Sequence, residues 1–282
     1  MNKNTIVKLT SDNIFSLIYH SLFEYPLTTL EFIKWQPGKK IRNLKISQVE
    51  YEYMNGFFYL KGSKGIVTSR MLRKRNSLKK IQIARKASKL LKKIPFIKMI
   101  GLTGSLSMFN AKDSSDIDLM LITRKDRLWI SRLITLILLS IYGFKVRRFK
   151  DKNEKNKICM NMWMDETNLV WPRKDRNFYT AHEIAQIIPL FDRQKTYQMF
   201  LNKNLWLKDY WPNSIKFEKP RRIQKKKKSD LIGKTVEKIA FGLQKFYMRN
   251  KITREVINAK KAIFHPIDRS ENINTRLMTF LK

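Results

Sequence analysis

The chain has 282 residues, of which 43% are hydrophobic and 12% aromatic, so its composition predicts a globular core and excludes a disordered protein. A single cysteine excludes a disulfide framework and a zinc site built from several cysteines, and it favours a cytoplasmic location. The net charge of +36 is typical of proteins that bind nucleic acids or nucleotides, but solvated lysine-rich faces would produce the same balance.

No stretch of the sequence predicts a membrane partner. Residues 1–13 lack the apolar core of a signal peptide. The longest apolar run, residues 133–144, is interrupted by polar residues and is shorter than the roughly 20 residues that span a bilayer. We therefore expect this run to form a buried helix. Nothing in the composition indicates an oligomeric state.

Residues 1–75 predict a small domain with the element order of a winged helix. Apolar spacing predicts a helix over 11–27, a capping-box pattern opens a second helix at 28–31, and a third helix covers part of 44–54. Two strands joined by a glycine-rich turn are expected over 57–70. Such a domain either docks on nucleic acid through its third helix and wing, or serves as a small packing or interaction domain.

Residues 76–172 alternate helices and strands, which predicts a small mixed sheet flanked by helices. The elements expected in this segment are a helix over 77–94, strands over 96–104 and 116–123, a helix over 127–143, and strands over 144–150 and 157–164.

Residues 173–282 predict a helical C-terminal domain. A helix starts at residue 180, an aromatic-rich segment covers 195–213, and helical spacing extends over 231–248. The basic run at 221–230 is typical of an exposed linker. The whole chain is therefore expected to have an α+β fold.

The most informative segment is "GLTGSLSMFNAKDSSDIDLMLIT". A buried strand leads into a turn at Gly104 and Ser105, and Asp116 and Asp118 lie on the next strand. Alternate residues of a strand point to the same face, so these two carboxylates are side by side. Neighbouring carboxylates repel each other, and a Mg²⁺ ion bound to both removes this conflict. The backbone N–H groups at the turn are suited to contact phosphate.

This pattern resembles the nucleotidyltransferase superfamily of DNA polymerase β-like enzymes. The superfamily motif is a glycine followed by Gly or Ser, a helix, and two acidic residues one apart on the next strand. Gly104, Ser105, Asp116 and Asp118 match it in order, type and spacing, and Ser115 also suits the pattern.

The order of segments resembles an uncharacterised bacterial and archaeal group that combines a winged helix, a nucleotidyltransferase core and a helical tail. The stretches that carry this resemblance are "YPLT", "IPFIKMIGLTGSL", "SDIDLMLIT", "TAHEIAQIIPLFD" and "FHP".

The resemblance implies transfer of a nucleoside monophosphate from a nucleoside triphosphate to an acceptor hydroxyl, with release of pyrophosphate. By that analogy Asp116 and Asp118 are catalytic and bind Mg²⁺, while Gly104, Ser105 and Ser115 hold the triphosphate. ATP is the expected nucleotide. The acceptor is not identified, and a nucleic acid or a protein are both candidates.

A basic cluster at 70–75 lies upstream of the motif. If it faces the aspartates, Arg73 would bind the triphosphate.

One position departs from the superfamily pattern. A third carboxylate is expected on a later strand, where "KICMNMWMDE" has the amide Asn161. Strand alternation puts Cys159, Asn161, Trp163 and Asp165 on one face, with Asp165 about 13 Å from Asn161 and too far away unless the strand bulges. Asn161 can bind a metal through its carbonyl oxygen but is a poor base. The enzyme therefore works with two carboxylates, receives an acidic group from elsewhere, or has lost activity.

Two functions remain open at this point. The first is a Mg²⁺-dependent nucleotidyltransferase, and the second is a binding or regulatory protein that uses the same core for nucleotide or nucleic acid without turnover. Three histidines provide no metal-ligand spacing. His20 is expected in the core or at its boundary, and His265 in a turn. His182 and Glu183 form either an acid–base or acceptor-binding pair or a polar helix start.

Overall fold

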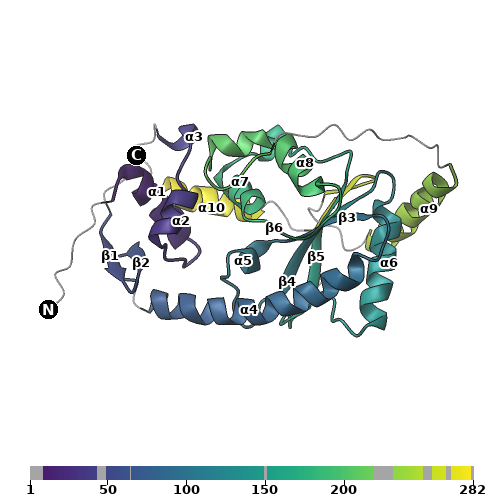
Figure 1. Ribbon diagram of the computed structural model, residues 1–282, viewed down its shortest axis with the longest axis horizontal. Coiled ribbons are helices and arrows are strands. Elements are labelled where there is room, and N and C mark those ends of the chain that lie inside the picture. The colour runs from purple at the N-terminus through teal and green to yellow at the C-terminus, as the bar shows by residue number, and fades with distance from the viewer. Residues whose placement is uncertain are drawn as a thin grey trace.

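The computed structural model describes residues 9–42, 49–63, 65–148, 151–218, 231–249, 256–264 and 268–280. These residues form an α+β fold with a mixed sheet and a mainly helical C-terminal part, which confirms the predicted fold class at this level (Figure 1). Within the described ranges, no helix combines the length and the apolar character that crossing a bilayer requires.

A six-stranded sheet forms the centre of the molecule. Its spatial order is β6-β3-β4-β5-β8-β7, with β4 and β5 parallel and the other neighbours antiparallel. The strands are β3 (Ile97–Leu102), β4 (Ile117–Thr123), β5 (Ile158–Asp165), β6 (Ile188–Asp192), β7 (Val256–Asn258) and β8 (Lys261–Ile263). The predicted strands at 96–104, 116–123 and 157–164 are therefore confirmed.

Helices cover both faces of this sheet. One core cluster joins α4 (Ile66–Leu91), α6 (Leu128–Ile141) and α9 (Leu231–Met248) to the face that carries Leu119 and Leu121. A second cluster joins the opposite face, which carries Met120 and Ile122, to α1 (Ser11–Ser21), α7 (Phe178–Ala185), α8 (Thr196–Lys203) and α10 (Asp268–Met278). Figure 1 shows α4 along one side of the sheet and α7 and α8 along the other.

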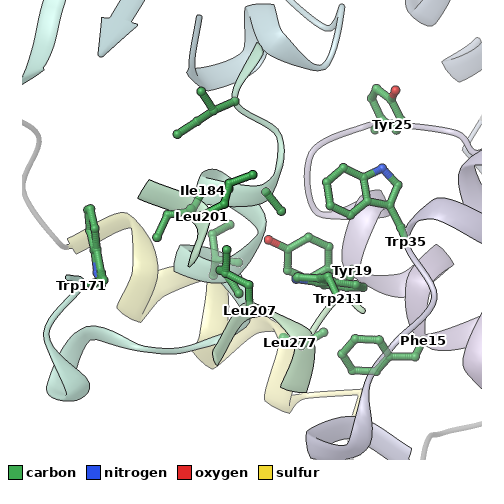
Figure 2. Packing of buried hydrophobic residues seen from close by; sticks show 14 of the residues in the cluster. Phe15, Tyr19, Tyr25, Trp35, Trp171, Ile184, Leu201, Leu207, Trp211 and Leu277 are labelled. Carbon is green, nitrogen blue, oxygen red and sulfur yellow. The ribbon is translucent and has the colours of Figure 1, made fainter. Parts of the chain in front are cut away.

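The second cluster connects the N-terminal and C-terminal parts of the chain. Phe15 and Tyr19 of α1, and Trp35 directly after α2 (Thr29–Lys34), lie beside Trp211 (Figure 2). The ring centroids of Tyr19 and Trp211 are 5.1 Å apart. Because these rings come from segments far apart in sequence, the core is continuous across those segments. Large rings buried in one cluster also contribute strongly to stability.

The N-terminal hairpin differs from its prediction. Strands β1 (Tyr51–Met54) and β2 (Phe57–Leu60) pair antiparallel around Asn55 and Gly56, which both have positive φ. An Asn-Gly pair favours this tight turn. The predicted second strand, beginning at residue 66, is instead the first part of α4, so the predicted pairing of strands over 57–70 is wrong.

The other N-terminal expectations have mixed outcomes. Helices α1 and α2 confirm the first two predictions, and a short α3 (Lys39–Arg42) follows them. Residues 43–48 lie outside the described residues, and 51–54 form a strand where part of the third helix was predicted. The boundary predicted at residue 75 falls inside α4. The winged-helix assignment itself stays a prediction.

Two corrections concern the sheet. Within its described part, the segment predicted as a strand at 144–150 makes a single bridge, between Val146 and Ile158. Residues 188–192, predicted as part of a helix, form edge strand β6, where Pro189 is tolerated because an edge needs fewer N–H donors. Together with β7 and β8, this strand brings the C-terminal third into the central sheet.

The remaining described elements are short helices, and two predictions concern residues that the structure does not describe. The short helices are α5 (Gly104–Ser107), η1 (Arg173–Asp175) and η2 (Leu205–Asp209). The predictions for His265 and for the basic linker at 221–230 fall outside the described residues.

Candidate active site

The Gly-Ser turn packs directly against the second aspartate. Gly104 has φ of +62°, and a Cβ atom added to it would lie 2.5 Å from Oδ2 of Asp118. The backbone N–H of Thr103 donates to the carbonyl oxygen of Asp118 at 3.0 Å. Ser105 follows as an exposed residue at the start of α5. The turn and the acidic strand are therefore in contact, as the motif predicts.

The two aspartates lie side by side. Asp116 directly precedes β4, and Asp118 is its second residue. One carboxylate oxygen of each and Sγ of Cys159 lie within 4.8 Å of one another, so this group could hold a metal ion. Nη1 of Arg147 is 2.6 Å from Oδ2 of Asp116, and Nδ2 of Asn161 donates to Oδ1 of Asp118 at 2.8 Å.

Burial and the closeness of the charged groups shift the pKa values of side chains at the site. The pKa of Asp116 is raised by burial and by the charge of Asp118, while Arg147 acts in the opposite direction. Burial, followed by the charge of Asp118, also raises the pKa of the Cys159 thiol, so this group is protonated at neutral pH. Arg147 contacts Glu154 as well, which places one guanidinium between two carboxylates.

A bulge in β5 changes which side chains face the site. Asp118 lies opposite Cys159, but Met120 lies opposite Met162, so β5 has one extra residue between these pairs. Beyond the bulge, Trp163 packs in the cluster on the other face of the sheet, with Leu121. The predicted common face for Cys159, Asn161, Trp163 and Asp165 is therefore wrong, because strict alternation fails at the bulge.

Asp165 has a structural role. One of its carboxylate oxygens accepts from the backbone N–H of Asp126 at 2.6 Å, and the other accepts from Thr167 at 2.7 Å. Both oxygens thus hold the loops that follow β4 and β5. Asp165 is fully buried and does not supply the third acidic group of the site.

A cavity of about 520 Å³ opens above the aspartates. Its walls come from the N-terminal segment, the central sheet and the C-terminal segment. The lining residues include His20, Phe23, Tyr25, Gly104, Ser105, Asn110, Ser115, Asp116, Asp118, Arg147, Glu154, Tyr179, His182, Glu183 and Gln186. Both aspartates, Gly104, Ser105 and Ser115 therefore share one cavity, as predicted. Asn161 contacts Asp118 but is not among the described residues that line the cavity.

Two arginines of the basic cluster before the motif pair with carboxylates other than the two aspartates. Arg73 forms an ion pair with Glu24, and its Nη1 is 3.5 Å from Oδ1 of Asn110. Arg73 does not belong to the described lining of the cavity. Arg70 is buried and pairs with Glu31 at 2.9 Å. The cationic group at the aspartates is Arg147, which sequence reasoning missed because it follows Asp116 by 31 residues.

A second missed residue is Lys80 of α4. Its Nζ donates to the backbone oxygens of Asp113 at 2.9 Å and Ser115 at 2.7 Å, and to Oδ1 of Asn156 at 2.8 Å. Lys80 therefore holds the loop that leads into Asp116. Its position is also on the buried stripe of α4, four residues before Ala84, and this periodicity was the signal that could have found it.

Two buried histidines meet at the edge of the cavity. Nε2 of His20 is 3.1 Å from Nε2 of His182, and Nδ1 of His20 is 2.8 Å from the carbonyl oxygen of Ser16. His182 stacks on Trp35 with 3.9 Å between centroids. Burial lowers the pKa of His20 to about 4 and lowers that of His182 as well, so both are neutral at pH 7. The predicted core location of His20 is confirmed.

Comparison with known proteins does not identify this chain: no protein-family model and no curated protein matches it. The proposals below therefore rest on the motif and on the geometry of the cavity.

Proposed function

We propose that the protein is a Mg²⁺-dependent nucleotidyltransferase that moves a nucleoside monophosphate from a nucleoside triphosphate, with ATP as the expected substrate, to a hydroxyl of an unidentified acceptor. The observation that carries this proposal is the contact between the Gly-Ser turn and the carboxylate pair. Gly104 leaves no room for a side chain beside Asp118, and both face the same cavity. A phosphate held at the turn would therefore lie next to the acidic pair.

The residues at the site fit a magnesium ion. Asp116 and Asp118 offer carboxylate oxygens, which Mg²⁺ prefers together with water and substrate phosphates. Oδ1 of Asn161 is buried and has no hydrogen-bond partner among the described residues, so it is an orphaned oxygen beside Asp118. When bound, Mg²⁺ would neutralise negative charge on the carboxylates and on the triphosphate.

The chain's own residues supply positioning and charge. Ser105 and the backbone at Gly104 would bind phosphate oxygens, and Arg147 lies close enough to the carboxylates to contact a neighbouring phosphate. In the reaction, the acceptor oxygen forms a bond to the α-phosphorus. The bond from that phosphorus to the bridging oxygen breaks, and pyrophosphate leaves with the electron pair. Such transfers depend mainly on positioning and electrostatic stabilisation.

A second function is supported by the way the carboxylates are already satisfied. Arg147 pairs with Asp116 and the Asn161 amide donates to Asp118, so the protein balances the pair with its own groups. This arrangement also suits a protein that binds nucleotide or nucleic acid for regulation, without turnover.

The test is a reaction with Mg²⁺ and each α-³²P-labelled nucleoside triphosphate, followed by pyrophosphate release and labelling of the protein or of added RNA. Asp118→Asn should lower the rate by a factor on the order of 100 or more. Asp113→Asn is the matched control, because Asp113 is an exposed residue paired with Lys155 and should leave the rate unchanged. Tight nucleotide binding without turnover would favour the regulatory function, and neither binding nor turnover would refute both.

A further inference from the structure

Gln186, the residue that caps the end of α7, contacts the Gly-Ser turn. Nε2 of Gln186 donates to the backbone oxygen of Gly104 at 3.3 Å and to Oε1 of Glu183 at 2.7 Å. A single amide nitrogen therefore bridges the Gly-Ser turn and a glutamate carboxylate. Gly104 is in turn packed against Asp118. Gln186 and Gly104 therefore connect Glu183 to the acidic pair.

Glu183 also lies on the surface of the cavity that contains the two aspartates. It lines the same cavity as Asp116 and Asp118, but it projects from α7 in the C-terminal segment and not from the sheet. Gln186 is buried, which fixes the carboxylate that it contacts. A carboxylate held in this way in the cavity that contains Asp116 and Asp118 can contact a substrate group that approaches from the α7 side.

We propose that Glu183 is the catalytic base of the reaction, the role that Asn161 cannot fill; this inference rests on the proposed function. Glu183 accepts the proton of the acceptor hydroxyl as the acceptor oxygen bonds to the α-phosphorus. Pyrophosphate leaves with the electron pair of the broken phosphorus–oxygen bond, and the proton later passes from Glu183 to solvent. The acceptor must therefore enter from the side of α7.

Glu154 and His182 also line the cavity, but each contacts another side chain. Glu154 forms an ion pair with Arg147. The Nε2 atom of His182 faces His20. Among the described lining residues, Glu183 best combines a carboxylate, access to the cavity and a fixed position next to the turn.

The first experiment compares Glu183→Gln with Glu218→Gln in the full chain. The introduced amide keeps an oxygen that can accept from Gln186, so the first variant removes the base and preserves the local contact. Glu218 makes an exposed pair with Lys195 and is the control with the same chemical change. We expect kcat for Mg·ATP to fall about 10²–10⁴-fold in Glu183→Gln, with the Kd for Mg·ATP within about twofold of wild type.

Three outcomes separate this inference from the function on which it depends. If Glu183→Gln retains more than half of wild-type kcat while Asp118→Asn is inactive, the base is another group and the proposed function stands. If Glu183→Gln instead loses nucleotide affinity in proportion to rate, Glu183 is a binding residue and the inference is overturned. If wild type has no turnover, both proposals fall.

A second measurement does not depend on the identity of the acceptor. A crystal structure with Mg²⁺ and α,β-methylene-ATP would show where the α-phosphorus lies. We expect the Glu183 carboxylate on the side of that phosphorus opposite the bridging carbon, about 4–7 Å away, which leaves room for an attacking oxygen in near-attack geometry. A carboxylate on the same side as the β-phosphate would contradict the assignment.

Discussion

At the scale of single residues, Gly104 connects the backbone of the turn to the acidic chemistry. Its positive φ is a conformation that L side chains rarely adopt, and the space beside it is filled by the Asp118 carboxylate. Two independent effects, strain and a clash, therefore exclude a side chain. Their consequences differ, because strain weakens the fold wherever it occurs, whereas the clash displaces the Asp118 carboxylate.

Gly104→Ala separates these effects when compared with Gly143→Ala. Gly143 also has positive φ, at +73°, but an added Cβ would meet no atom within 4 Å. We expect Gly143→Ala to cost about 1–2 kcal/mol in urea unfolding and to leave nucleotide binding intact. Gly104→Ala should cost more and should weaken Mg·ATP binding at least tenfold, measured by calorimetry. An equal effect of the two substitutions on stability and on Mg·ATP binding would show that Asp118 moves aside without consequence.

At the scale of elements, α4 does more than cover the sheet. Lys80 reaches from its buried stripe to the backbone oxygens of Asp113 and Ser115, in the loop before β4. Burial lowers the pKa of this amine, but three oxygen partners satisfy its donors. The helix therefore sets the position from which the acidic strand starts, and the loop depends on a side chain up to 35 residues earlier.

Lys80→Met tests this dependence, because methionine has a similar length and no donor. Two backbone oxygens and the Asn156 side chain would lose their partner. A fully buried unsatisfied group costs about 1–3 kcal/mol, and these part-buried oxygens recover some of that cost by hydrogen bonding to water. We expect unfolding free energy to fall by about 2–4 kcal/mol. Lys79→Met, at an exposed neighbouring position, is the control and should change stability by less than about 0.5 kcal/mol. A stability equal to that of the control would mean that the loop holds itself.

At the scale of the whole molecule, the cavity exists because segments far apart in sequence share one core. Helix α1, the central sheet and the C-terminal helices all contribute to the cluster shown in Figure 2. The contact between His20 and His182 lies at this junction and joins the N-terminal segment to α7. The stability of the junction therefore depends on whether these histidines stay neutral.

This dependence has a defined direction with pH. The pKa of His20 is lowered by burial to about 4, so below pH 6.5 the unfolded chain binds a proton that the folded protein excludes. The contribution is fully present above pH 6.5 and is lost as pH falls, by about 3 kcal/mol at pH 4 for His20 alone. Urea unfolding at pH 7, 6, 5 and 4 measures it.

Histidine NMR supplies the check on this assignment, because carboxylates also titrate in the lower part of this range. The signals of His20 and His182, assigned with His20→Gln and His182→Gln, should not shift between pH 8 and 5. Titration of either near pH 6.5 would contradict the buried, neutral pair.

Much of the candidate site was predictable from local sequence. Gly104, Ser105, Asp116 and Asp118 lie on one stretch in which a short helix follows β3 and precedes β4. The alternation of side chains on a strand brings the carboxylates together without reference to the rest of the chain. The same local reasoning failed on β5, because a bulge depends on how that strand pairs with β4, and it missed the Asn-Gly hairpin turn, whose signal was present in the sequence.

By itself, the sequence determined the α+β class, the central strands and the acidic pair beside a Gly-Ser turn, because these follow from the spacing of residues that are close in the chain. Only the tertiary structure decided that Arg147 pairs with Asp116, that Lys80 holds the loop, and that α7 brings Glu183 to the turn. Apart from the local contact between Gln186 and Glu183, these contacts join residues from 31 to 82 positions apart. Their partners are selected by packing of the whole core, which no local pattern encodes.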